Sequence, residues 1–165
     1  MIDKERLIVA EIPRLRRYAR ALTGDRTAAD DLVQDCLERA WSRFHLWRRG
    51  SDMRAWLFTI MHNIHVNDLR QARRRPSHLA LAEDMAGPRQ RDTLEALGLA
   101  RALARLPEDQ RAAVLLVGLE DMSYAEAAKI LGLPIGTVRS RLARGRERLR
   151  RLMAGDGPEV VKGIK

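Results

Sequence analysis

Apolar residues recur at intervals of three and four along almost the whole chain, whereas the alternation of apolar and polar residues typical of a half-buried strand is nearly absent. This spacing predicts an all-α protein in which each helix has one apolar face. Seven helices are expected, at about 4–22, 27–44, 53–74, 94–105, 108–119, 123–131 and 135–152.

The helical periodicity fades after the third predicted helix, where Gly87 and Pro88 interrupt the chain. The net charge is +6 over residues 1–75, −2 over residues 76–98 and +5 over residues 99–165. Two basic helical modules therefore flank a neutral-to-acidic connector. We expect two small helical domains, at 1–75 and 95–153, which are joined by a flexible linker at 76–94 and followed by a tail at 154–165.

The charge of the whole chain is +9, and it comes from 27 Arg and 4 Lys against 22 acidic residues. This balance favours a polyanionic partner, and Arg pairs bidentately with phosphates and guanine edges. A GC-rich genome would also favour Arg, so the preference alone does not identify nucleic acid. The 45% hydrophobic content excludes a disordered chain, and no apolar run approaches the ~20 residues of a membrane span.

Cysteine usage and the N-terminus bear on the compartment. A single cysteine, Cys36, excludes an intramolecular disulfide and a multi-cysteine zinc site, and it fits the apolar face of its helix. Residues 1–20 mix acids with bases and lack the apolar core of a secretory signal. We therefore expect a cytoplasmic protein that does not insert into a membrane.

The C-terminal domain contains a helix-turn-helix pattern. Ser123 and Glu126 have the spacing of a capping box, a turn follows at 132–134, and Val138 and Leu142 give the next, basic helix an inward face. Such a unit places the first half of its second helix in the major groove of DNA. A structural helical hairpin with a solvated Arg face is the alternative. The candidate DNA contacts are Thr137, Arg139, Ser140, Arg141 and Arg144.

This domain resembles region 4 of bacterial sigma factors of the extracytoplasmic-function group. The resemblance lies in LPEDQRAAVLL at 106–116, MSYAEAAKILG at 122–132 and GTVRSRLARGRERL at 136–149. It implies recognition of the minus-35 promoter element and a contact with the β flap of RNA polymerase.

An acidic helix face stands out in the N-terminal domain. The segment DDLVQDCLERAW at 30–41 resembles region 2.2 of the same family, which docks on the clamp helices of the polymerase β′ subunit. An acidic face on a basic protein suits a basic protein partner. The helix dipole would account for Asp30 and Asp31, but Glu38 lies beyond the first turn. The candidates for polymerase binding are Asp31, Gln34, Asp35 and Glu38.

Five of the seven aromatic residues fall between positions 41 and 58, where arginines are interleaved with them. Aromatic rings beside a basic groove are typical of proteins that hold single strands and extruded bases. Helical spacing favours a core position for Trp41 and Trp56, whereas Trp47 lies in a loop.

The resemblance assigns residues 44–58 to region 2.3 and its specificity loop, where a base of the minus-10 element is flipped out, and residues 59–75 to region 2.4. Asn63 falls where many members have an Asn that helps to read this element, and His62 departs from the small or apolar residue usual before it. The candidates for minus-10 contact and DNA opening are Trp47, Arg48, Arg49, Asn63, Arg70, Arg73 and Arg74.

The chain lacks a constellation of residues suited to catalysis. His62, His65 and Asp68 are spaced by three and converge poorly on a helix, so we expect no metal site and no other cofactor. The sequence offers no convergent carboxylate, His or Cys set for an enzyme that acts on nucleic acid.

The two resemblances together imply a sigma factor that binds core RNA polymerase, directs it to promoters through minus-10 and minus-35 contacts, and promotes DNA opening. Members of the group are commonly held inactive by an anti-sigma factor, which is a further expected partner. Two alternatives remain at this stage: a helix-turn-helix regulator that is not a polymerase subunit, and a sigma-like mimic that only binds an anti-sigma factor.

Overall fold

The computed structural model describes residues 3–74 and 94–155, and the all-helical prediction is confirmed. The predicted linker, apart from Leu94, and tail residues 156–165 lie outside the described part of the chain. The elements are α1 (Lys4–Thr23), α2 (Arg26–Ser42), η1 (Phe44–Leu46), α3 (Met53–Arg74), α4 (Leu94–Ala104), α5 (Glu108–Val114), η2 (Leu115–Leu119), α6 (Tyr124–Leu131) and α7 (Ile135–Met153).

The connection between α1 and α2 is short and capped on both sides. Gly24 ends α1 with a φ of 68°, and its N–H donates to the Arg20 carbonyl over 2.9 Å. The Asp25 carboxylate begins α2 by accepting from the N–H groups of Thr27 and Ala28 at 3.2 and 3.3 Å. The expected start at Thr27 is therefore slightly late, because a carboxylate beside the positive end of the helix is the stronger cap.

The capping box before α6 is confirmed. The Ser123 hydroxyl accepts from the Glu126 N–H at 3.1 Å, and the Glu126 carboxylate accepts from the Ser123 N–H at 2.9 Å. Gly132, with a φ of 66°, ends α6 and turns the chain towards α7. These local signals fix the length of α6 and the angle at which α7 follows it.

The helix expected at 108–119 is not α-helical throughout. After Val114 it widens into a π-helical turn, η2, and the N–H of Glu120 then donates to the Leu115 carbonyl at 3.0 Å. Such wide turns are rare and often lie at functional sites. Here the turn leads into Glu120, whose side chain is completely buried.

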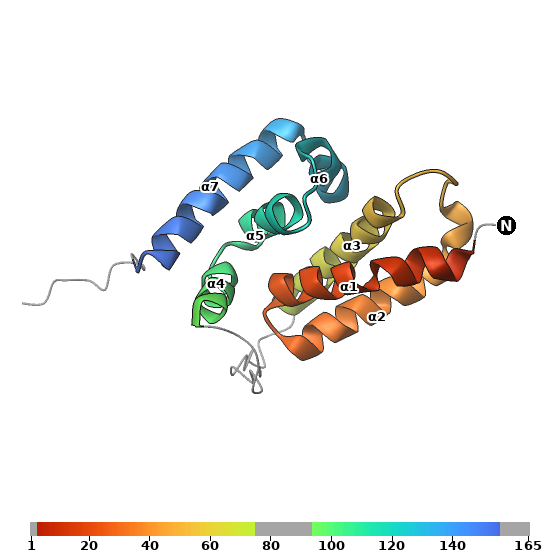
Figure 1. Ribbon diagram of the computed structural model, residues 1–165, viewed down its shortest axis with the longest axis horizontal. Coiled ribbons are helices and arrows are strands. Elements are labelled where there is room, and N and C mark those ends of the chain that lie inside the picture. The colour runs from red at the N-terminus through yellow and green to blue at the C-terminus, as the bar shows by residue number, and fades with distance from the viewer. Residues whose placement is uncertain (1–2, 75–93, 156–165) are drawn as a thin grey trace, which may run out of the picture.

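The helices form two groups, α1–α3 and α4–α7 (Figure 1). In the first group α2 packs against α1 and α3, and Tyr18 meets Phe58 edge to face at 5.0 Å between ring centres. In the second group α7 packs against α4, α5 and α6, with Val138 and Leu142 buried as predicted. Cys36 is also in the core, as expected.

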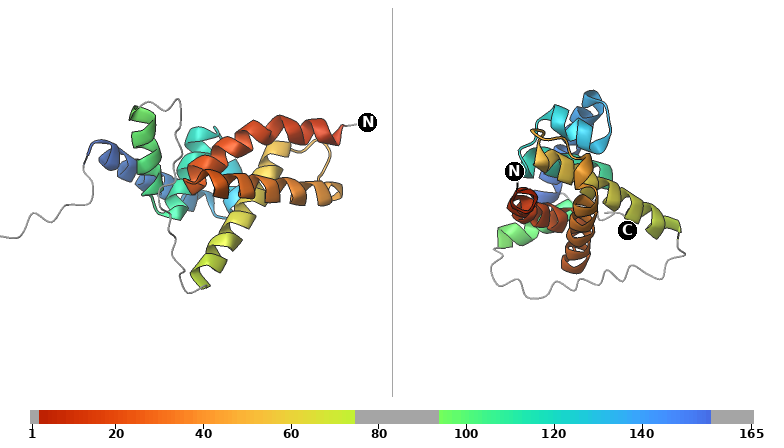
Figure 2. Two further views of the ribbon diagram at one scale, coloured as in Figure 1. Left: turned by 90° about the horizontal axis from the view of Figure 1, so that it is seen from below. Right: turned by 90° about the vertical axis from the view of Figure 1, so that its right-hand side faces the viewer.

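The two groups also contact each other. Helix α3 packs against α6, and α1 packs against α4 and η2, as the views in Figure 2 also show. Buried apolar residues of both groups join in one cluster. The sites of the two domains are therefore held in a fixed relation in this arrangement.

Candidate nucleic-acid and protein-binding surfaces

Helix α7 presents a basic outer face. Val138 and Leu142 anchor its first half, and Arg139, Ser140 and Arg144 on the other side are exposed. Thr137 is half-buried, and its carbonyl accepts a hydrogen bond from the Ser140 hydroxyl at 3.0 Å. The basic side chains on this face are therefore accessible, as a helix that enters a DNA groove requires.

The arginines of this helix are held differently. The Arg139 guanidinium lies 5.5 Å from the centre of the Tyr124 ring on α6, a cation–π contact that orders it at the surface. The Arg141 Nε lies 3.6 Å from the Asp109 carboxylate on α5. Arg139 therefore contacts a neutral ring, whereas Arg141 is partly neutralised by a carboxylate.

The acidic residues of α2 form one exposed stripe. Asp31, Gln34, Asp35 and Glu38 are all exposed, and the Gln34 amide donates to the Glu38 carboxylate at 3.2 Å. A shallow hollow continues the stripe towards α3, and Asp68 lines it from that side. Burial and the neighbouring Asp35 raise the pKa of Asp68. The hollow thus has carboxylates on both walls, with Arg39 and Arg43 beside those of α2.

Two expectations about the aromatic cluster are reversed. Trp41, expected in the core, is 48% exposed, and the Lys4 ammonium lies 4.6 Å from its ring centre. Trp47, expected to be available in a loop, is only 9% exposed, because η1 turns it inward against Phe44 at 5.4 Å. A stacking role for Trp47 stays a prediction that requires this loop to move.

The other tryptophan packs against the edge of the core, and the loop arginines are exposed. Trp56 is half-buried and meets Phe44 edge to face at 6.3 Å. Arg48 and Arg49 are exposed beside the buried Trp47. The loop thus presents charge rather than an aromatic face to its surroundings.

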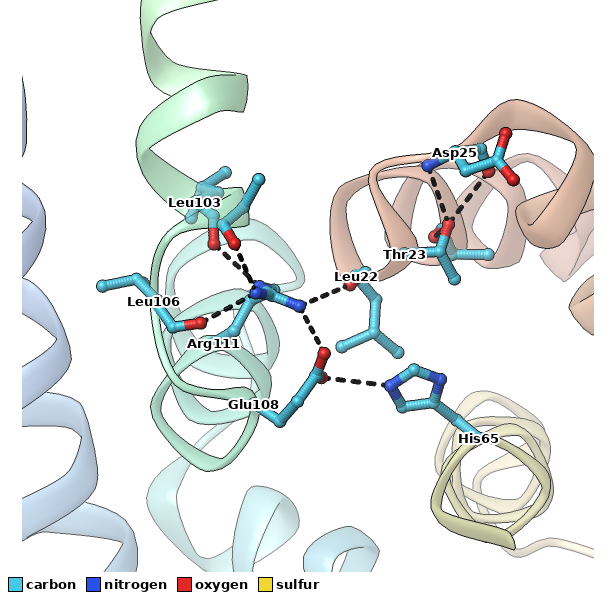
Figure 3. Close-up of polar contacts among 10 residues, drawn as sticks. Leu22, Thr23, Asp25, His65, Leu103, Leu106, Glu108 and Arg111 are labelled. Carbon is cyan, nitrogen blue, oxygen red and sulfur yellow. Dashed lines mark hydrogen bonds and ion pairs between the residues drawn. The ribbon is translucent and has the colours of Figure 1, made fainter. Parts of the chain in front are cut away.

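Helix α3 carries further exposed candidates for DNA contact. They are Asn63, Arg70, Arg73 and Arg74. The two histidines of the same helix face the other domain instead. The His65 Nε2 lies 3.2 Å from the Glu108 carboxylate (Figure 3). Burial, followed by the charges of His65 and Arg141, lowers the pKa of His62 to about 4.

The spaced histidines do not form a metal centre. His65 faces α5, whereas Asp68 lines the hollow beside α2. Within residues 3–74 and 94–155, no three His, Cys, Asp or Glu side chains are grouped to hold a metal ion. None of the helices in this part of the chain is long and apolar enough to cross a membrane.

The polar contacts between the domains were missed by the sequence reasoning. Arg17 pairs with Glu120, and Arg54 donates to the Glu120 carbonyl at 3.2 Å. Arg111 donates to the Leu22 carbonyl at 3.1 Å. These partners lie 66 to 103 positions apart, so no local pattern pairs them.

Two family models match the chain: the Sigma2 domain of PhyR over residues 8–62, and Sigma-70, region 4, over residues 96–149. The protein EcfG, an ECF RNA polymerase sigma factor of Rhodopseudomonas palustris, is 40% identical over 92% of this chain and 86% of its own length. SigM, an ECF sigma factor of Mycobacterium tuberculosis, is 38% identical over 84% of this chain and 71% of its own.

Solved structures agree with these relatives. The sigma factor RpoE of Bartonella quintana, in complex with the anti-sigma factor NepR, has a TM-score of 0.79 at 34% identity, over 95% of this chain and all of RpoE. CnrH, in complex with the cytosolic domain of CnrY, has a TM-score of 0.68 at 29% identity, over 93% and 89%. The chain therefore belongs to the ECF family of RNA polymerase sigma factors, which initiate transcription and are not enzymes.

Proposed function

We propose that this sigma factor divides its contacts among three surfaces. The exposed face of α7 binds the minus-35 element, and it is assisted by a contact of the same domain with the β flap. The exposed residues of α3 and the 43–52 loop read and open the minus-10 element. The acidic stripe of α2 docks on the β′ clamp helices.

The separation of charge on the surface supports this division. The basic face of α7 and the acidic stripe of α2 belong to different domains, and both are exposed. A duplex and a basic protein surface can therefore be bound at once without competing for residues.

We further propose that an anti-sigma factor controls this protein in the cytoplasm, where the polymerase works. RpoE was solved with the anti-sigma factor NepR, and CnrH was solved with the cytosolic domain of CnrY. Their likeness to this chain extends over both domains. The inhibitor would bind by covering surfaces that polymerase and DNA need.

Transcription in vitro tests the proposal. Core polymerase is combined with this protein on a library of promoter fragments, and sequence-specific transcripts are expected only when the protein is present. Duplex binding without polymerase-dependent initiation would favour the helix-turn-helix regulator. The match to the Sigma2 domain of PhyR keeps the mimic as a second candidate. Binding to an anti-sigma factor, with neither DNA binding nor transcription, would favour that mimic.

Arg139→Ala is expected to reduce discrimination at one base pair of the minus-35 element by about 5- to 150-fold, the value of one bidentate base contact. This loss of discrimination is measured by competition binding at fixed salt, with duplexes that carry every single-base variant of the element as competitors. Arg148→Ala, an exposed change later on α7, is the matched control and should weaken all sequences about equally. Equal effects of the two changes would remove Arg139 from base recognition.

Asp31→Ala combined with Glu38→Ala is expected to weaken binding to core polymerase by about 5- to 30-fold, because two exposed charge pairs are lost. Binding of the free protein to a minus-35 duplex should stay unchanged. The control removes two exposed carboxylates elsewhere, Glu5→Ala with Glu95→Ala. If this control weakens polymerase binding as much, net charge rather than the α2 stripe governs docking.

A further inference from the structure

Helices α5 and α7 pack against each other (Figure 1), and Gly145 lies at their contact. A Cβ atom placed on this glycine would lie 2.7 Å from Cγ2 of Val114 and 3.3 Å from both Cβ and the carbonyl oxygen of Gln110. Real Cβ atoms essentially never have contacts below 3.0 Å, so a larger residue here would displace its surroundings. No other glycine in the described part of the chain has a neighbour this close to the position of a Cβ.

Helix α7 gains nothing from a glycine at this position. Gly145 lies in the interior of a 19-residue helix, where glycine is among the least favourable residues because it loses the most backbone freedom. Gln110 and Val114 are four residues apart, so they form one ridge on the surface of α5. The bare backbone at Gly145 is the groove that receives this ridge. The close approach of the two helices therefore explains the glycine.

The first half of α7 is held separately from this contact. Val138 and Leu142 are buried in the core. The Arg141 Nε lies 3.6 Å from the carboxylate of Asp109 on α5. These residues fix the half of the helix that carries the candidate base contacts. The contact at Gly145 comes after them and sets the angle at which the helix leaves that anchor.

A small displacement at Gly145 is large on the scale of base recognition. Moving the Cβ contact with Val114 from 2.7 Å to 3.4 Å, where ordinary contact begins, exceeds the ~0.5 Å range of N–H···O distances. Val114 is buried and β-branched, so its side chain has few other rotamers to adopt. Because Val138 and Leu142 hold the first half of α7, the helix would tilt about them. Arg139 lies six residues before Gly145, about 9 Å along the axis, and it would be re-aimed.

We propose that Gly145 is a positioning residue for minus-35 recognition. It lets the 110–114 ridge of α5 seat α7 at the tilt that aims Arg139 and its neighbours at base edges. The inference rests on the proposed function of α7, and it assigns Gly145 no contact with DNA. Bidentate base contacts depend on this tilt because they need a fixed direction, whereas long arginine side chains reach phosphates from several angles.

The first test measures base discrimination by the full chain in complex with core polymerase, on single-base variants of a minus-35 duplex at fixed salt. Gly145→Ala should reduce this discrimination by about 3- to 10-fold, a fraction of the roughly 5- to 150-fold that one whole bidentate contact is worth. Binding to a duplex without the element should change by less than about twofold. A merely less stable protein would bind both duplexes more weakly and keep the wild-type ratio.

A control and a rescue accompany this variant. Gly98→Ala makes the same change inside α4, where an added Cβ meets no atom within 4 Å, and it should keep wild-type discrimination. Val114→Ala removes the methyl group that the new Cβ would meet. Adding it to Gly145→Ala should therefore return discrimination towards wild type. Wild-type discrimination in Gly145→Ala, or no recovery in the double variant, would overturn the positioning role.

Urea unfolding of the free, full chain tests the contact without DNA. Gly98→Ala should raise the urea midpoint by about 0.3–1 M, because alanine favours a helix. Gly145→Ala should not raise it, because the close contact opposes this gain.

Val114→Ala should lower the urea midpoint less in Gly145→Ala than in wild type, as expected of residues that touch. Equal effects in the two backgrounds would overturn the close contact. If the wild-type complex shows no minus-35 discrimination while this coupling is present, the proposed function and the positioning role fail together and the close contact stands.

Discussion

Arg111→Met is expected to lower the free energy of unfolding by about 3–5 kcal/mol, the cost of removing one partner from a buried charged network. Arg111 is only 7% exposed, yet its guanidinium donates five hydrogen bonds. Methionine fills similar space but donates none of them. The acceptors are the carbonyls of Leu103, Leu22, Ala104 and Leu106 and the Glu108 carboxylate.

The positions of these carbonyls explain the size of the effect. Leu22 lies in the last turn of α1, and Leu103 and Ala104 lie at the end of α4. The last carbonyls of a helix lack partners within the helix and carry its negative end charge. A single guanidinium therefore caps two helices from different domains and pairs with a carboxylate.

Urea unfolding followed by circular dichroism measures this change. Arg105→Met, an exposed arginine just after α4, is the control and should change stability by less than about 0.5 kcal/mol. Arg111→Lys keeps the charge but lacks the planar fork of the guanidinium, so its free energy of unfolding should lie between those of Arg111→Met and wild type. A loss below about 1 kcal/mol for Arg111→Met would mean that water replaces the guanidinium.

The helices could be predicted from the sequence because their signals are local. The apolar spacing predicts α3 at the residues where it is observed, and the capping box predicts the start of α6. Each signal depends on residues within one or two turns of each other. The change from α5 to η2 has no such signal, because both are hydrogen-bonded helices with similar side-chain preferences.

The tryptophans could not be placed in the same way. Helical spacing indicates that Trp41 shares the apolar face of α2, yet its side chain is 48% exposed and the Lys4 ammonium lies 4.6 Å from its ring centre. Trp47 is buried because the backbone turns back at η1, where the Trp47 N–H donates to the Phe44 carbonyl at 3.0 Å. Burial depends on what another segment covers, and periodicity within one helix carries no information about that.

The candidate surfaces were easier to predict than the contact between the domains. The acidic stripe of α2 follows from positions within one helix, and the structure leaves its members exposed. Arg17 and Glu120 carry no mark of their pairing, since the protein has many arginines and their separation is 103 residues. Only the tertiary structure shows which arginine pairs with Glu120.

His62 is expected to make the protein less stable in acid, by about 3 kcal/mol between pH 6.5 and pH 4. Its pKa in the folded protein is about 4, lowered by burial and by the charges of His65 and Arg141 from an ordinary 6.5. Between these values the unfolded chain binds the proton and the folded chain does not. The free energy of unfolding therefore decreases as the pH falls through this window and is level above it.

Urea unfolding at intervals from pH 7.5 to pH 4 measures this slope in wild type, in His62→Gln and in His45→Gln, an exposed control. The slope should shrink in His62→Gln and persist in His45→Gln. Glu108 also makes the protein less stable in acid, but its effect falls at a lower pH than that of His62. Burial raises its pKa, yet His65 and Arg111 together hold it below 4.5, so its contribution is lost only under more acid conditions.

The position of His62 connects this effect with the contact between the domains. His62 lies on α3, and the nearby cation Arg141 belongs to α7 of the other domain. Its Nδ1 is buried without a hydrogen-bond partner in the described part of the chain, so a proton there would gain no acceptor. Protonation thus opposes the packed arrangement. If His62→Gln unfolds with the wild-type slope, the acid sensitivity arises elsewhere and His62 is charged in the folded protein.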